Sequence, residues 1–324
     1  MRDKSHIIDS IYEAAIVPDL WVRVIELIAD YTGCYGGSLF SVGSGGTMMT
    51  ASRNCEPHLH ALLNEGWASR NIRAQRLVDM ARNGFVTDHD LCTQEEIETH
   101  EIFTHFLRPR GLGWGIGTHI VGAGGDIAVF SLDQLYDRGP VSSVVRNFLD
   151  EIRPHIARSA MLATQFRMER VKGTLSSLDM LGIPAAAVTR NGNVTSANNR
   201  FHNHEGEVFT GAFNKLVLRD RSANTLMEQA ISQLHLHKIP RSIPLISASS
   251  EAPLVVHIIP IERQARDIFS STDAIVVIVP ISFPGLPFKA LAQSLYDLTH
   301  SEARVCRGPF MWLFCQRYRP PVPA

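Results

Sequence analysis

The sequence has few cysteines, and no two of them stand close enough to form a CxxC pair. The five are Cys34, Cys55, Cys92, Cys306 and Cys315. An odd number at long spacing is typical neither of a disulfide framework nor of a metal knuckle, and it fits a reducing compartment.

Long apolar runs and an excess of charge are also missing. No apolar stretch reaches the roughly 18 residues of a membrane helix, and charges and Pro18 break the N-terminal stretch that a signal peptide would need. Lys plus Arg number 31 and Asp plus Glu 32, a net charge of −1. This balance argues against a chain built as a whole to bind nucleic acid or membranes, so we expect a cytoplasmic protein without membrane contact.

Catalytic and metal-binding motifs are absent as well. The glycine-rich stretches at 111–117 and 122–126 do not match GxGxxG or GK[ST], and no GxSxG occurs. H-x-H pairs stand at 58–60, 202–204 and 235–237 without a third ligand at suitable spacing. We therefore predict no catalytic residue, no metal and no cofactor, and interpret the glycines as parts of sheet strands and the histidines as exposed.

The N-terminal half alternates between helical and strand-like patterns. Apolar residues at spacings of three and four predict helices over 5–16 and 21–33. Short apolar runs around glycine-rich turns predict hairpins over 36–52 and 113–133. The stretch between the hairpins, 57–107, predicts several helices.

Within that stretch, Thr93 and Glu96 have the spacing of a capping box. The order of elements predicts an α+β sensor-type domain, GAF/PAS-like, over 1–140, with helices packed on one face of a small antiparallel sheet. Met48, Met49, Phe130 and Met161 are core candidates.

The longest helical pattern covers 141–181 and predicts a connector helix, which we place at 141–174. Val145, Leu149 and Ile152 are spaced four and three, which is typical of a helix that pairs with a second copy. A helix that lies on its own domain is an equally open alternative. Pro154 should kink or interrupt this helix.

Residues 175–283 form a second module. AAAVTRNGNVTSANN reads as two strands around an Asn191–Gly192 turn. A helical stretch and three strand-like runs follow. This order resembles a PAS domain, that is, an antiparallel sheet with helices, and a Pro- and Gly-rich linker follows at 284–298.

The stretch LTHSEARV at 298–305 reads as the start of a further helix. Leu298 precedes the cap, Thr299 can cap the helix, and Glu302 can reach back to it. The stretch resembles the opening of the helix-turn-helix domain in LuxR-type transcription regulators. IYEAAIVPDLWVRVIELIADYTGCYGGSLF and FLDEIRPHIARSAMLATQF resemble sensor segments of one LuxR-like group, so the resemblance covers residues 7 to about 305.

Residues 299–324 depart from that family. Pro309, Pro320 and Pro321 interrupt a stretch without helical periodicity, so no recognition helix can be placed. We expect a truncated or frameshifted remnant that keeps only Thr299, Glu302 and Arg304, and no sequence-specific DNA binding. DNA binding is then expected only in full-length relatives.

A small-molecule signal is expected in the first domain. Trp67, Arg73, Asp88 and Trp114 are the candidate ligand-binding residues, because acyl-homoserine-lactone receptors of this superfamily use a Trp/Tyr…Asp…Trp set. Packing of both tryptophans in the core is the alternative.

The sequence thus predicts a non-enzymatic sensor that forms a homodimer, or a heterodimer with an intact relative, through the connector helix. One alternative is a small-molecule-processing enzyme hidden in a sensor fold, which a cavity with two or three convergent ionisable groups would favour. A truncated product without function is another.

Overall fold

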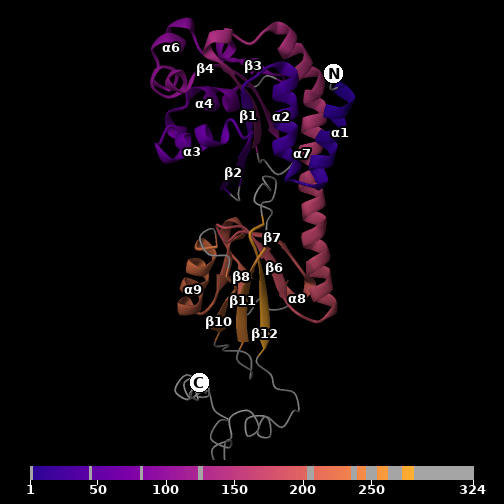
Figure 1. Cartoon of the computed structure of the whole chain (residues 1–324). Helices are drawn as coiled ribbons and strands as arrows, with labels where there is room; N and C mark the ends of the chain where they lie inside the picture. The colour runs from indigo at the N-terminus through magenta and orange to yellow at the C-terminus, as the bar shows by residue number, and fades with distance from the viewer. Residues whose placement is uncertain are drawn as a thin grey trace, which may run out of the picture.

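One long helix, α7 (Ser143–Met180), connects two antiparallel sheets, as Figure 1 shows. The computed structural model describes residues 3–43, 46–80, 83–122, 127–202, 208–234, 239–245, 254–261 and 272–280. The predicted α+β fold, with two sheet-containing domains and a long helix between them, is confirmed. The predicted linker at 284–298 and the remnant at 299–324, with Thr299, Glu302 and Arg304, lie outside the described residues, as do His204, His235 and His237.

The first domain contains a five-stranded sheet and most of the helices. Its helices are α1 (Lys4–Ile16), α2 (Leu20–Thr32), α3 (Glu56–Asn64), α4 (Ile72–Asp79), α5 (Asp88–Leu91) and α6 (Gln94–Thr99). Its strands are β1 (Gly36–Gly43), β2 (Gly46–Ala51), β3 (Val86–Thr87), β4 (Leu112–Val121) and β5 (Ile127–Leu135). A π-helical segment (Ile102–Leu107) and 3₁₀ turns at Ala68–Arg70, Arg108–Arg110 and Tyr136–Arg138 complete it.

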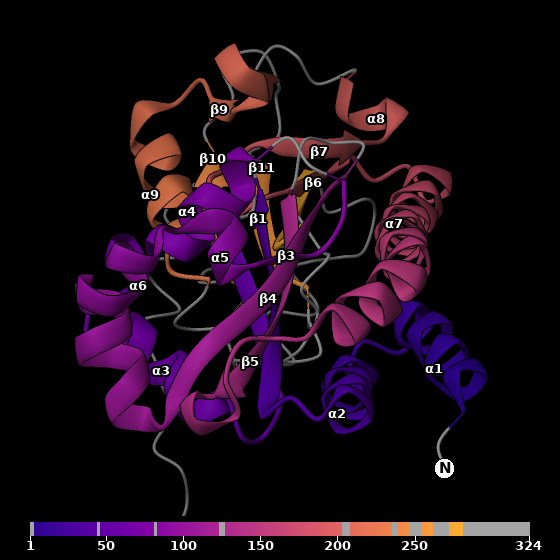
Figure 2. The same cartoon turned by 90° about the horizontal axis from the view of Figure 1, so that it is seen from above.

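Helices cover both faces of the first sheet, so the prediction of helices on one face is wrong. Figure 2 shows α1, α2 and α7 on one side of the strands and α3 to α6 on the other. Successive side chains of a strand point to opposite faces of the sheet, and in this sheet both faces carry apolar side chains that helices must bury. Leu39, Ile120 and Phe130 enter the core beneath α1, α2 and α7, while Phe40 and Val129 face the other way.

The local signals in the first domain are confirmed. Gly33 ends α2 in the left-handed conformation, with φ of 72°. Thr93 and Glu96 form the predicted capping box at the start of α6. Arg76 donates hydrogen bonds to both carboxylate oxygens of Glu96 at 2.7 Å, which lowers the pKa of Glu96 to about 2 and fixes α6 against α4.

The second domain has a five-stranded antiparallel sheet and a small two-stranded one. Its elements are β6 (Ala185–Val188), β7 (Val194–Ala197), α8 (Asn199–His202), β8 (Val208–Thr210), the 3₁₀ turn Ala212–Asn214, β9 (Leu216–Leu218), α9 (Arg221–Ser232), β10 (Arg241–Leu245), β11 (Leu254–Pro260) and β12 (Ala274–Pro280). The sequence did not predict the β8–β9 hairpin. Gly192, in the predicted turn, has φ of 81°.

Both five-stranded sheets have the same strand order. The first reads β2-β1-β5-β4-β3, and the second reads β7-β6-β12-β11-β10 from its other edge. In each, the first and last strands of the domain pair antiparallel at the centre. The two domains are therefore one topology used twice.

Helix α7 packs on both domains. Leu149, Ile152 and Ile156 are buried in the first core, and Leu175 is buried against the second sheet. The first part of the helix thus lies on its own domain, as the alternative interpretation expected. The predicted interruption at Pro154 is wrong, because buried residues on both sides hold the helix continuous despite one missing hydrogen bond.

Three of the four core candidates lie in the interior of the first domain. Phe130 is fully buried, Met48 packs against the first core, and Met49 lines a cavity. Met161 is 48% exposed, so its assignment to the core is wrong. It lies on the solvent side of α7, between buried Ser159, Ala160 and Ala163.

Candidate ligand cavity

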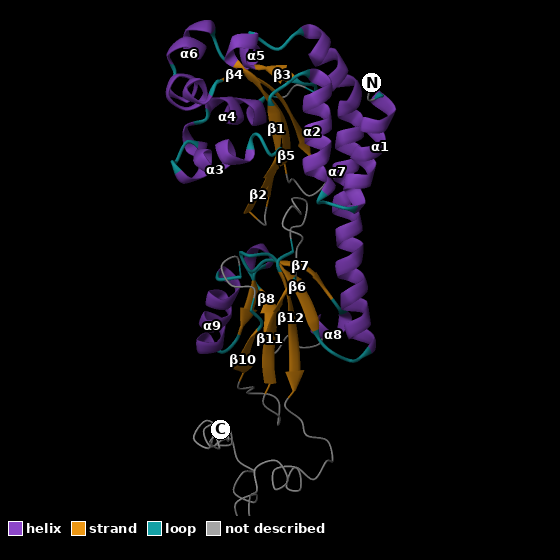
Figure 3. Cartoon of the chain, viewed as in Figure 1, coloured by secondary structure: helices purple, strands orange, loops and turns teal. Residues whose placement is uncertain are grey.

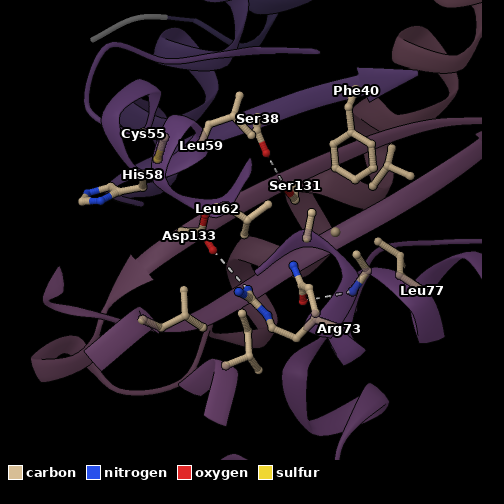
Figure 4. A pocket seen from close by; sticks show the side chains of 18 of the residues that line it. Ser38, Phe40, Cys55, His58, Leu59, Leu62, Arg73, Leu77, Ser131 and Asp133 are labelled. Atoms are coloured by element: carbon tan, nitrogen blue, oxygen red, sulfur yellow. Dashed lines mark hydrogen bonds and ion pairs between the residues drawn. The ribbon is translucent and has the colours of Figure 1, made fainter. Parts of the chain in front are cut away.

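A cavity of about 310 Å³ lies between the first sheet and the helices on the side away from α7. Strands β1, β4 and β5 form its floor and α3, α4 and the π-helical segment cover it, as the close-up in Figure 4 shows in part. Its walls are mostly aliphatic and aromatic: Phe40, Val42, Met49, Leu59, Leu62, Leu63, Leu77, Val86, Leu91, Ile102, Phe106, Leu107, Leu112, Ile116 and Val129.

One end of the cavity carries an ion network centred on Arg73. The Arg73 Nε donates to Asp88 Oδ1 at 2.7 Å, and Nη2 donates to Asp133 Oδ1 at 3.1 Å. The backbone N–H of Gly115 donates to the other Asp88 oxygen, Oδ2, at 2.7 Å. Arg73 comes from α4, Asp88 from the start of α5, and Asp133 from β5, so three separate segments meet here.

The network lies against two glycines of β4, Gly115 and Gly117. A Cβ on Gly115 would stand 1.5 Å from Arg73 Nη2, and one on Gly117 would stand 3.0 Å from Leu77. The two glycines of β4 therefore let α4 approach the sheet closely. They belong to the GLGWGIG stretch and, as predicted, serve a strand rather than a phosphate loop.

Burial and charge act in opposite directions on this network. Burial raises the pKa of Asp88 above its ordinary value, while Arg73 and the Gly115 amide oppose that rise. Burial lowers the pKa of Arg73, but the two carboxylates outweigh it and the net direction is upward. Because both Asp88 oxygens accept N–H donors, the geometry is that of an ionised carboxylate paired with a guanidinium.

Five further polar residues line the cavity. The hydroxyls of Ser38 and Ser131, paired across β1 and β5, lie 2.9 Å apart. Asn71 accepts from the Ala74 backbone N–H at the start of α4. Burial raises the pKa of Cys55 to about 12, so this thiol stays protonated at neutral pH.

The fifth is a histidine. Burial lowers the pKa of His58, and only Asp133 opposes this change. His58 is therefore mostly neutral at pH 7.

The four predicted site residues separate into two pairs. Arg73 and Asp88 line the cavity and bond to each other. Trp67 and Trp114 are not among the lining residues. Trp67 packs against Phe106 with ring centroids 5.7 Å apart, and its indole N–H donates to Glu65.

Trp114 is held in a stack outside the cavity. Its ring lies parallel to Tyr136, with 5° between the planes, and close to parallel with His89 on the other side. Its indole N–H donates to the Tyr136 carbonyl at 3.1 Å. Both tryptophans are partly buried and pack against the cluster that contains Phe103 and Phe106, and neither lines the cavity.

The segment that carries Asp88 is attached to α7. Asp150 of α7 accepts a hydrogen bond from the Phe85 N–H at 2.7 Å, and Arg146 pairs with Asp90 at 3.1 Å. Arg153 of α7 donates to the Thr118 hydroxyl on β4 at 2.8 Å. The polar end of the cavity is thus linked to the connector helix by direct contacts.

The ion network bears on the enzyme alternative, because Arg73, Asp88 and Asp133 are three convergent ionisable groups. Their bonding argues against catalysis. An arginine stays protonated, and Asp88 has both oxygens engaged by donors. The Ser38 hydroxyl bonds another hydroxyl rather than a base. Cys55 is protonated, so neither residue is an activated nucleophile.

Within the described stretches, no three His, Cys, Asp or Glu side chains are grouped so that they could hold a metal ion. No described helix combines the length and apolar character needed to cross a membrane.

No protein-family model and no curated protein matches the chain. Among solved structures, the LBD domain of VqsR from Pseudomonas aeruginosa matches at 11% identity, covering 50% of this chain and 96% of that one, with a TM-score of 0.40. The N-acylhomoserine lactone dependent LuxR family transcription factor CepR2 from Burkholderia cenocepacia matches at 13% identity, covering 50% and 98%, with a TM-score of 0.38.

The PAS domain of Bordetella pertussis BvgS matches at 13% identity, covering 41% of this chain and 98% of that one, with a TM-score of 0.27. These matches are to regulator and sensor domains. Identities and TM-scores this low assign neither a family nor a ligand to this chain.

Proposed function

We propose that this chain is a non-catalytic sensory protein of the LuxR-regulator type, whose first domain binds a small, largely apolar molecule. The observation that carries the proposal is the cavity of about 310 Å³ between sheet and helices. Its size, its apolar walls and its few polar groups are typical of small-molecule sites. The ion network of Arg73, Asp88 and Asp133 forms the polar end.

The signal reaches α7 through the segment that follows Gly84. A ligand that moves Asp88 also moves Phe85 and Asp90, which α7 holds through Asp150 and Arg146. A ligand that prefers one position of this segment therefore shifts the helix between its positions. Dimerisation through α7, with a second copy or an intact relative, completes the proposal. The absence of sequence-specific DNA binding by 299–324 stays a prediction.

Filling the cavity tests the proposal. Naphthalene, an uncharged apolar probe, should shift the amide NMR signals of Gly115 and Gly117 in the full-length chain. Ala74→Phe places a ring in the cavity from α4 and should weaken naphthalene binding by about tenfold or more, because the space is taken.

Gln75→Phe is the matched control, since Gln75 is the next residue of the same helix and is exposed. It should bind naphthalene as the unmodified chain does. No binding to the unmodified chain, or equal binding by both variants, contradicts the proposed function.

A further inference from the structure

The charges that line the cavity do not balance. Among the described lining residues, Arg73 is the one permanent cation, and it faces two carboxylates, Asp88 and Asp133. His58 is mostly neutral at pH 7, because burial lowers its pKa. The cavity therefore holds one uncompensated negative charge.

That charge belongs to Asp133 rather than to Asp88. Asp88 is 3% exposed and receives a donor on each oxygen. Asp133 is 20% exposed and receives one side-chain donor, from Arg73 to Oδ1. Within the described residues no donor is directed at the other oxygen, Oδ2. Oδ2 is not among the buried polar atoms without a partner, so it is open at the surface of the cavity and can accept a donor from a ligand.

The surroundings of Asp133 fit a small cation better than an anion or a neutral acceptor. Ser131 precedes Asp133 by two residues on the same face of β5, and its hydroxyl pairs with Ser38. Figure 4 shows these side chains along the cavity floor beside Arg73. Their oxygens can accept further N–H donors, and a primary ammonium carries three.

We propose that the cavity selects amphiphilic primary amines, with the ammonium group held by Asp133 and the apolar body among the leucine and phenylalanine walls. Arg73 then serves as a fixed internal partner of Asp88 rather than as a receptor for an acidic ligand. This inference rests on the proposed function, since it names the class of molecule that the sensory cavity takes.

A matched series of probes tests the selection. Octylamine, octanol and octanoate have the same chain length and differ in the charge of the head group, and calorimetry with the full-length chain at neutral pH gives their affinities. We expect octylamine to bind about tenfold tighter than octanol, because a charge-assisted hydrogen bond replaces a neutral one. Octanoate should bind most weakly, since it meets Asp133.

Asp133→Asn keeps the shape of the side chain and removes its charge. It should reduce octylamine affinity to about that of octanol, within about twofold, and leave octanol unchanged. Asp137→Asn is the control, because Asp137 is exposed in the turn after β5 and does not line the cavity. Thermal unfolding shows whether each variant is folded. The order of the three probe affinities in the unmodified chain tests the selection even if a variant does not fold.

The outcomes separate the two proposals. Equal binding of the three probes, or tighter binding of octanoate, overturns the amine selection while the sensory cavity stands. A preference for octylamine that survives in Asp133→Asn also overturns it. Absence of binding by all three probes and by naphthalene overturns the proposed function itself.

Discussion

At the scale of single residues, Gly115 decides whether the ion network can form. The Arg73 guanidinium occupies the space where any other residue would carry its Cβ. The sequence singled out Arg73 and Asp88 but not Asp133. An aspartate at the end of a strand carries no local signal, and its meeting with Arg73 depends on the pairing of β4 with β5.

Gly115→Ala should destabilise the chain. The new methyl group would displace Arg73 and leave the buried Asp88 and the partly buried Asp133 without their cation, which costs about 3 kcal/mol. Urea unfolding measures this as a lower midpoint at unchanged slope. Gly173→Ala is a useful contrast, because Gly173 lies in α7 with nothing near its Cβ position. It should stabilise by about 0.5–1 kcal/mol, so equal stability of the two variants would contradict this account of Gly115.

At the scale of elements, the sequence predicted what local periodicity and turn chemistry determine. The helices α1 and α2, the hairpins and the Thr93 cap follow from such signals. β3 has two residues, which is too short for a period, and exists because Val86 pairs with Gly117. The helices over 57–107 were predicted, but their place on the second face of the sheet was not, because nothing local shows which side of a strand a helix covers.

The attachment of β3 and α5 to α7 predicts an effect of Asp150. Asp150→Ala removes the acceptor for the Phe85 N–H. Exchange of that amide with deuterium should become about tenfold faster or more, as expected for the loss of a hydrogen bond to a charged group.

Glu151→Gln changes the neighbouring residue, which pairs with Lys4 on the surface, and should leave the Phe85 amide protected. Unchanged exchange in Asp150→Ala would show that the segment does not depend on α7.

At the scale of the whole molecule, one sheet topology serves two purposes. In the first domain the side of the sheet away from α7 holds a cavity. In the second, Phe201, Met227 and Leu234 fill the core against the sheet. Strand order therefore does not reveal where a ligand binds, and the size of the side chains on each face decides it.

The exposed apolar residues of α7 predict self-association. Phe166 and Met168 are 48% and 50% exposed in the middle of the helix. Phe166→Glu should weaken dimerisation by about tenfold or more, since a charge would enter an apolar contact, and sedimentation velocity over a concentration series measures it. Phe213→Glu is the control, because Phe213 is 94% exposed and lies far from α7 in sequence. A chain that stays monomeric, or a dimer unaffected by Phe166→Glu, rules out this interface.

The length of α7 has a mechanical consequence. At 1.5 Å per residue its 38 residues measure about 57 Å. A rigid rod of that size converts angle into displacement, so a tilt of about one degree at the cavity end moves the far end by about 1 Å. Under the proposed function the helix would act as a lever arm, so that a small tilt beside Asp88 would reposition the second domain.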